Sequence, residues 1–285
     1  MRCLVSLAVL AACSGSPAAS TPPPPTRAQT TAPTKATIVD SHVHLAFYPV
    51  ADQLAEHGVR AAVDLASPER ALGTKYPLLV MQSGPMLTRP GGYPLDSWGK
   101  DGYGIGCEDR DCLLDAIDRL HDHGARIIKI ALDDNGLPRP LAQFATNRAH
   151  QLGLKVAVHA LSDASARAAA EIGADVLAHT PLELLAQKTV DAWATPPGKR
   201  AVITTLAAFG GSDEAIDNLR RLHEAGVTVL YGTDLGNLRI DGPSQDEIAL
   251  MRRAGMTTEE ITAAMTAVPW KFWGFDEAMQ ASKTR

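Results

Sequence analysis

The sequence predicts an α/β protein of the (β/α)8 class, the TIM barrel. From residue 37 onward, eight short apolar runs alternate with helical stretches. The runs are rich in Val, Ile and Ala and almost continuously apolar, which is typical of parallel strands covered on both faces. Eight strand–helix repeats indicate a closed parallel barrel. A doubly wound open sheet is the structural alternative, but no Gly-x-Gly-x-x-Gly follows the first run.

The expected strands and helices can be placed in order along the chain. The apolar runs cover residues 36–45, 59–66, 76–84, 125–132, 155–160, 175–180, 201–209 and 227–234. Helical stretches such as 144–153 and 213–226 end in Gly just before the next run, the expected helix stop. Two helices follow the last run, and Thr257 with Glu260 predicts a capping box at the start of the second. Trp270, Phe272 and Trp273 are expected to pack against the barrel core.

A long Gly-rich connection, residues 85–112, follows the third run. It is expected to be a loop at the C-terminal rim of the barrel, where loops contact substrates. Arg89, Tyr93 and Trp98 could touch substrate there, but loop residues of this kind are expected to face solvent.

Composition limits the possible functions. With 285 residues, 45% of them hydrophobic and 21% charged, the chain can form one large core, expected over residues 37–282. The net charge of −5 argues against nucleic acid as a partner, because phosphate binders are normally basic. A small-molecule substrate is expected instead, and the sequence makes no prediction of an oligomeric state.

The N-terminus carries an export signal. Residues 1–13 have one positive charge followed by a short apolar run, and Leu10–Cys13 resembles the bacterial lipobox, in which the Cys is lipidated. A plain secretory signal is the alternative. Ser14 favours the outer membrane, so the expected location is the bacterial cell envelope, lipid-anchored through Cys13 on the periplasmic side. Residues 14–36 are rich in Pro, Thr, Ser and Ala and are expected to be a disordered linker.

Two cysteines remain after Cys3 and Cys13 are assigned to the signal. An exported protein permits a disulfide, so Cys107 and Cys112 are expected to close a small loop. Free thiols are the alternative, and a metal role is disfavoured because no second thiol pair exists.

Polar side chains interrupt the apolar runs at or near their C-terminal ends. They are His42 and His44 in the first run, Lys129 in the fourth, His159 in the fifth, His179 in the sixth and Asp234 in the eighth. Each alone has a structural explanation, such as a hydrogen-bonded core His or an Asp helix cap. Together they lie at the rim where barrel enzymes place their active sites, which predicts a metal centre.

Lys129 indicates how two ions could be held. Burial in an apolar strand lowers a lysine pKa, and a neutral amine can add CO₂ to give a carbamate that bridges two metal ions. Two divalent ions about 3.5–4 Å apart would share a hydroxide of lowered pKa, and Asp234 can take its proton as it attacks. If Lys129 stays unmodified, one ion is expected, with Asp234 and His179 handling the water.

These residues and their surrounding motifs resemble the metal-dependent amidohydrolase superfamily, most closely its imidazolonepropionase/prolidase-related branch. The similarity covers about residues 37–277 and includes "VDSHVHL", "GARIIKIAL", "VAVHA", "LAHT", "YGTD" and "RPGGYP". The resemblance implies a (β/α)8 barrel, usually with Zn²⁺, and hydrolysis of a C–N bond. By matching position, His42 and His44 would bind the more buried ion and His159 and His179 the second, with N6-carboxylated Lys129 bridging them and Asp234 as ligand and base.

The chain departs from the pattern of that superfamily in one large feature. Many relatives carry a small β-sandwich, which is expected to be absent here because the first strand directly follows the linker. The expected function is a metal-dependent hydrolase that cleaves an amide or peptide-like C–N bond by attack of a metal-bound hydroxide. A lactone or phosphotriester hydrolase on the same site, or a non-catalytic envelope lipoprotein that binds a ligand, are the alternatives.

Overall fold

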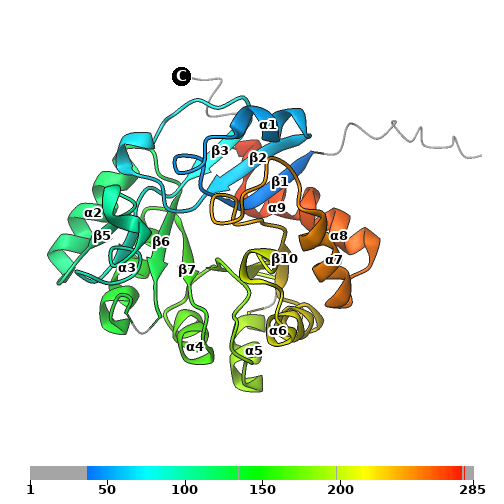
Figure 1. Cartoon of the computed structure of the whole chain (residues 1–285). Helices are drawn as coiled ribbons and strands as arrows, with labels where there is room; N and C mark the ends of the chain where they lie inside the picture. The colour runs from blue at the N-terminus through cyan, green and yellow to red at the C-terminus, as the bar shows by residue number, and fades with distance from the viewer. Residues whose placement is uncertain (1–36, 134, 197, 278, 280–285) are drawn as a thin grey trace, which may run out of the picture. The chain divides into compact units, whose positions relative to one another are not determined.

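The computed structural model describes residues 37–133, 135–196, 198–277 and 279 (Figure 1). The predicted signal peptide, the lipid on Cys13, the linker and the last residues of the expected barrel lie outside the described residues. No helix in the described ranges has both the length and the apolar character needed to cross a membrane.

All described strands pair in parallel, in two sheets, as the α/β prediction requires. The three-stranded sheet has the order β1 (Ile38–Val43), β2 (Val59–Asp64) and β3 (Leu79–Gln82). The seven-stranded sheet has the order β10 (Thr228–Leu230), β9 (Ala201–Ile203), β8 (Val176–Leu177), β7 (Lys155–His159), β6 (Ile127–Ala131), β4 (Met86–Thr88) and β5 (Gly104–Gly106).

Helices connect the strands, and Figure 1 shows α2 to α6 on the outer side of the seven-stranded sheet. The α-helices are α1 (Ala51–Glu56), α2 (Arg110–Asp122), α3 (Arg139–Gln151), α4 (Asp163–Glu171), α5 (Gln187–Ala194), α6 (Asp213–Glu224), α7 (Gln245–Arg253), α8 (Thr258–Met265) and α9 (Ala267–Trp273). Three 3₁₀ turns are η1 (Glu69–Ala71), η2 (Trp98–Asp101) and η3 (Ala207–Phe209). The predicted capping box of Thr257 and Glu260 starts α8.

The strands are apolar on both faces because each face packs against a separate core. A large cluster of buried side chains lies between the strands and the helices. A second cluster combines strands of both sheets, such as Val39 of β1 and Ile203 of β9, with Trp273. Trp270 and Phe272 pack against this second cluster, as predicted for the C-terminal aromatic residues.

The prediction of one strand over 76–84 followed by a loop over 85–112 was wrong in its details. Strand β3 ends at Gln82, and the following residues form β4 and β5, which belong to the other sheet. Gly84 has a positive φ of 69° and Pro85 has no N–H to donate, so the ladder is interrupted between β3 and β4. The run 201–209 is also shorter than predicted, because β9 ends at Ile203 and η3 follows.

Backbone hydrogen bonds join the edges of the two sheets. The Ser41 N–H donates to the Tyr231 carbonyl at 2.9 Å, and the Asp234 N–H donates to the His42 carbonyl at 2.9 Å. On the other side, the Arg126 N–H donates to the Gln82 carbonyl at 3.0 Å. These bonds bring the C-terminal end of β1 beside the segment that follows β10.

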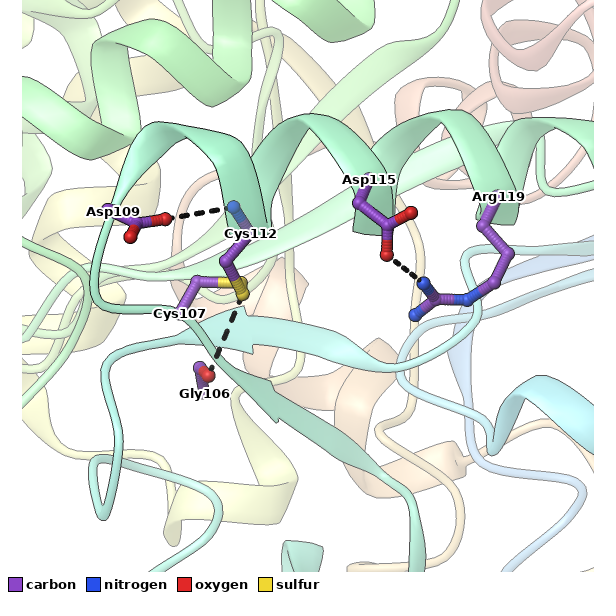
Figure 2. Close-up of a disulfide and its surroundings, with 6 residues drawn as sticks. All are labelled: Gly106, Cys107, Asp109, Cys112, Asp115 and Arg119. Carbon is purple, nitrogen blue, oxygen red and sulfur yellow. Dashed lines mark hydrogen bonds and ion pairs between the residues drawn. A yellow bond between two sulfur atoms is a disulfide. The ribbon is translucent and has the colours of Figure 1, made fainter.

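A disulfide joins the end of the β5 segment to the first turn of α2, as the sequence favoured. Figure 2 shows the bond between Cys107 and Cys112. Asp109 is the N-cap of α2, and its Oδ1 accepts the Cys112 N–H at 2.9 Å. The disulfide therefore fixes the chain that follows β5 to the start of α2.

Tyr231 packs in the core, and its hydroxyl accepts the Ser244 N–H at 2.7 Å. Tyr231→Phe keeps the ring but leaves that buried N–H without an acceptor, which is expected to lower the free energy of unfolding by about 1–3 kcal/mol. Urea unfolding followed by circular dichroism measures the change. Tyr48→Phe, at a half-buried position, is the matched control, and an unchanged midpoint for Tyr231→Phe would contradict the role of this hydroxyl.

Candidate metal centre

The structure brings all six predicted site residues together in the interior. His42 lies in β1 and His44 just after it, Lys129 lies in β6, His159 ends β7, His179 follows β8 and Asp234 follows β10. None of the six is more than 5% exposed. They converge because the C-terminal ends of parallel strands meet at the same edge of their sheets.

Asp234 lies at the centre of the first group of contacts. Its Oδ1 is 3.0 Å from Nε2 of His44 and 3.5 Å from Nε2 of His42. Nζ of Lys129 lies 3.4 Å from the same Nε2 of His42. His42, His44 and Asp234 each offer one ligand atom, and these atoms lie within 4.8 Å of one another, so one metal ion could contact all three.

His159 and His179 form a second group beside the first. The His179 ring centroid is 4.6 Å from that of His42 and 4.9 Å from that of His159. Nδ1 of His179 lies 3.1 Å from Oγ1 of Thr205. If that nitrogen carries the proton, Nε2 of His179 keeps its lone pair for a ligand.

Hydrogen bonds fix which nitrogen of His42 can bind a metal. Its Nδ1 donates to the Ala178 carbonyl at 2.8 Å, which leaves the lone pair on Nε2, the atom that faces Asp234 and Lys129. Metal-binding histidines usually donate the N–H of their other ring nitrogen to a carbonyl or carboxylate.

Two other ring nitrogens are buried without a partner. Nδ1 of His44 and Nδ1 of His159 have no hydrogen-bond partner among the described residues. Nε2 of His159 lies 3.3 Å from Oδ2 of Asp133, whose Oδ1 accepts the Ser165 hydroxyl at 2.6 Å. A buried polar atom without a partner is costly, so these nitrogens are places where a bound ion would compensate for the loss of water.

Burial sets the protonation of the cluster. Burial lowers the pKa of Lys129 to about 7 and that of His159 to about 3, and it holds the pKa of His42 and His179 well below the usual value. Burial alone would raise the pKa of Asp234, but His42, His44 and Lys129 outweigh it and keep that pKa below its usual value. At neutral pH, His42, His159 and His179 are therefore neutral and Asp234 is a carboxylate, which are the forms that bind divalent metals.

A polar network holds the segment that carries Asp234. Asp234 has a positive φ of 56°, and the Asn237 side-chain amide donates to both of its carboxylate oxygens at 3.1 Å. Asp40 accepts the Thr233 hydroxyl at 2.6 Å and the backbone N–H groups of Thr233 and His42. Asp40 thus orients the ligands through their backbone, and burial raises its pKa to about 7.

Aromatic side chains cover the centre. The ring of Tyr93 stacks on His159 with centroids 4.4 Å apart, and the rings of Trp98 and His44 form a T-shaped pair with centroids 5.3 Å apart. Phe209 contacts His179 at 5.0 Å. The expectation that Tyr93 and Trp98 face solvent was therefore wrong, because Trp98 Nε1 donates to the Tyr93 hydroxyl and holds both rings against the site. Arg89 is exposed, as expected.

Sequence reasoning also missed several polar neighbours of the ligands. They are Thr205, Asp133, Asn237 and Asp64. Asp64 ends β2 and is fully buried near His44, and burial raises its pKa to about 7. Asp64 could have been found from the sequence, because a carboxylate inside the apolar run 59–66 indicates a buried polar group. The other three residues lie on connections whose conformation the sequence does not predict.

No protein-family model matches the sequence. No curated protein matches it either. The structure is similar to a Xaa-Pro dipeptidase with bound methionine in its active site: the TM-score is 0.70, sequence identity is 16%, and the match covers 85% of this chain and 76% of that chain.

Two further solved structures give the same result. An amidohydrolase matches with a TM-score of 0.67 and 18% identity over 85% of this chain and 75% of that chain. Phenylurea hydrolase B matches with a TM-score of 0.65 and 15% identity over 85% of this chain and 75% of that chain. At these identities the similarity shows the fold, an α/β fold with parallel strands that these hydrolases share.

Thr205→Val tests whether the contact at Nδ1 of His179 prepares the other ring nitrogen for a metal. The variant keeps the shape of the side chain but removes the oxygen, and it is expected to weaken zinc affinity about 10–100-fold. Competition with a chromophoric chelator measures the affinity. Thr180→Val, which removes a buried hydroxyl bonded to a backbone carbonyl, is the matched control. Equal zinc affinity of the Thr205→Val variant and the unmodified chain would contradict the assignment.

Proposed function

We propose that this chain is a metal-dependent hydrolase that cleaves an amide or peptide-like C–N bond in a small-molecule substrate. We place it in the amidohydrolase superfamily, in the imidazolonepropionase/prolidase-related branch. The observation that carries the proposal is the convergence of four His, one Lys and one Asp in a site where none is more than 5% exposed. The hydrolases with a similar fold support it.

The donor set fits a divalent metal, and Zn²⁺ is the ion we propose. Imidazole nitrogens and a carboxylate oxygen are ligands that zinc takes in catalytic sites. Nδ1 of His159 has no partner while its Nε2 faces Asp133, which supports an ion in the second half of the cluster. His42, His44 and Asp234 would hold the first ion, and His159 with His179 the second.

Lys129 is the candidate bridge between the two ions. Its amine is buried, 3.4 Å from Nε2 of His42, and no carboxylate of the described residues forms a salt bridge with it. A neutral amine adds CO₂ and loses a proton to give an N6-carboxylated lysine, whose two oxygens could serve both ions. Without this modification, the site would hold one ion.

The chain's own groups account for the proton movements of the reaction. A bound divalent ion supplies Lewis-acid catalysis and lowers the pKa of water. Asp234, ionised and oriented by Asn237, accepts the proton of the attacking water and then donates it to the leaving amine. His179, oriented at Nδ1 by Thr205, would keep Nε2 free to hold the second ion.

We also propose that the two sheets form one closed (β/α)8 barrel over residues 37–282. The backbone bonds between Ser41 and Tyr231 and between Arg126 and Gln82 support closure on both sides. The mixed core cluster supports it as well, because strands of both sheets contribute to it.

Export and lipid anchoring at Cys13 complete the proposal. We propose that residues 1–13 are a lipoprotein signal, that 14–36 are a linker, and that the enzyme lies on the periplasmic side of a bacterial outer membrane. The Cys107–Cys112 disulfide supports an oxidising compartment, since disulfides rarely persist in the cytosol.

Lys129→Ala tests the bridging role. The purified unmodified chain, prepared with zinc and bicarbonate, is expected to contain about two ions, and Lys129→Ala one or fewer. Elemental analysis by plasma mass spectrometry measures the content. Lys155→Ala, which removes a half-buried lysine at the opposite end of a neighbouring strand, is the matched control and should keep two. One ion in both the unmodified chain and Lys129→Ala would indicate a mononuclear site, and no ion in either would contradict metal dependence.

A matched set of an amide, a lactone and a phosphotriester tests the bond that is cleaved. We expect kcat/KM to be highest for the amide, with Asp234→Ala lowering it about 10²–10⁴-fold because proton transfer is lost. Chromatographic detection of each product measures the rates. Faster hydrolysis of the lactone or phosphotriester would reassign the reaction, and no hydrolysis by the zinc-loaded chain would leave a binding function.

A further inference from the structure

A substrate that reaches the centre has to pass a row of aromatic side chains. Trp98, which forms a T-shaped pair with His44, also contacts Phe47 and Tyr103, with ring centroids 6.2 and 5.7 Å away. Phe47 packs edge-to-face on Tyr103 at 6.0 Å. Phe47 is 37% exposed, whereas His44 is 3% exposed, so the row runs from solvent to a ligand of the proposed ion.

A guanidinium lies at the solvent end of this row. The Arg239 guanidinium carbon is 5.5 Å from the Phe47 ring centroid and 4.8 Å from that of Tyr48. The side chain of Arg239 is exposed. Among the described residues, no carboxylate forms a salt bridge with it. Contact with aromatic faces restrains a guanidinium while leaving its in-plane N–H groups available for an anion.

The chain segment that carries Arg239 packs closely against the metal centre. Arg239 and Asp234 lie on the same connection between β10 and α7. A Cβ built on Gly236, between them, would lie 2.8 Å from Cβ of His44 and 3.5 Å from Cδ1 of Phe47. The connection that carries Asp234 and Arg239 therefore runs directly against His44 and Phe47.

We propose that Phe47, Trp98 and Arg239 select the substrate, an amide with an anionic group separated from the scissile bond by a planar or apolar body. This inference rests on the proposed hydrolase function. The apolar body would pack on Phe47 and Trp98 once Trp98 moves away from His44, and the anion would bind Arg239. Arg239 contacts this row at Phe47, its solvent end, so an anion one carbon from the amide at the buried centre would lie short of the guanidinium.

Three acetamides separate the contributions of ring and charge. 4-Acetamidobenzoate has both, 4-acetamidoacetophenone has the ring without the charge, and N-acetylglycine has the charge without the ring. With the zinc-loaded full chain, we expect kcat/KM for 4-acetamidobenzoate to exceed that for each of the others at least tenfold. Release of the amine product measures the rates.

Three variants test which residues determine this substrate selectivity. Arg239→Gln should reduce the preference for 4-acetamidobenzoate over 4-acetamidoacetophenone to less than about twofold. Arg252→Gln, which removes one exposed positive charge at the end of α7, is the matched control and should keep the full preference. Trp98→Ala should lower kcat/KM for both ring compounds by a larger factor than kcat/KM for N-acetylglycine, which has no ring to pack on Trp98.

Binding calorimetry with the same zinc-loaded protein distinguishes the two possible failures. Hydrolysis of all three acetamides with similar kcat/KM would overturn the selectivity while the hydrolase function stands. If none is hydrolysed, a Kd for 4-acetamidobenzoate at least tenfold below that for 4-acetamidoacetophenone, lost in Arg239→Gln, would support the recognition without the reaction. Equal Kd values would overturn the inference.

Discussion

The desolvation of six polar side chains in one buried volume is the constraint on which the rest of this structure depends. Burying imidazoles, an amine and a carboxylate is unfavourable unless each is paired or bound to an ion. The protein contributes part of the compensation, through the contacts among Asp234, His42 and His44. The partnerless nitrogens of His44 and His159 show where that compensation is incomplete.

Much of the surrounding structure holds these groups in place. Asp234 and Thr205 both adopt positive φ, 56° and 42°, which is unfavourable for residues other than Gly and persists only where neighbouring contacts impose it. Asp40 fixes the segment before Asp234 through Thr233. The buried carboxylate of Glu247 accepts the N–H groups just after Thr205, at Leu206 and Ala207. Helix α7, which carries Glu247, thereby fixes the connection that orients His179.

The aromatic cover and the disulfide belong to the same region of the chain. Tyr93 and Trp98 lie between β4 and β5, and the disulfide at Cys107 follows β5 directly. The covering segment is thus anchored by strand pairing before it and by the disulfide and the capped start of α2 after it. The rings exclude water from the ligands, which strengthens the electrostatic interactions among them.

The parallel α/β fold and the grouping of the six polar residues could both be predicted from the sequence, for one physical reason. Strands buried on both faces appear in the sequence as apolar runs. A polar residue at the C-terminal end of such a run lies at the edge of the sheet where the ends of all its parallel strands meet. His42, Lys129 and Asp234 could be placed in this way. The contacts made by loops could not, because they depend on backbone conformations that local patterns do not specify.

The region after β3 illustrates this limit. The Gly-rich composition of residues 85–112 indicated a loop, but parallel pairing with β6 makes Met86–Thr88 a strand, and this pairing depends on residues some 40 positions away. Tyr93 and Trp98 are held against His159 and His44 by the same tertiary arrangement. The contact between Thr205 and His179 likewise depends on an unusual φ that nothing in the sequence around Thr205 marks.

X-ray absorption at the zinc edge reports the atoms around the ion itself and therefore tests whether these histidines bind it. For the zinc-loaded full chain, we expect nitrogen and oxygen neighbours at about 2.0–2.2 Å with the outer-shell scattering of imidazole rings. The imidazole scattering should fall when His42 and His44 are both replaced by Ala. A spectrum without imidazole, or one unchanged by those substitutions, would contradict a zinc site at these histidines.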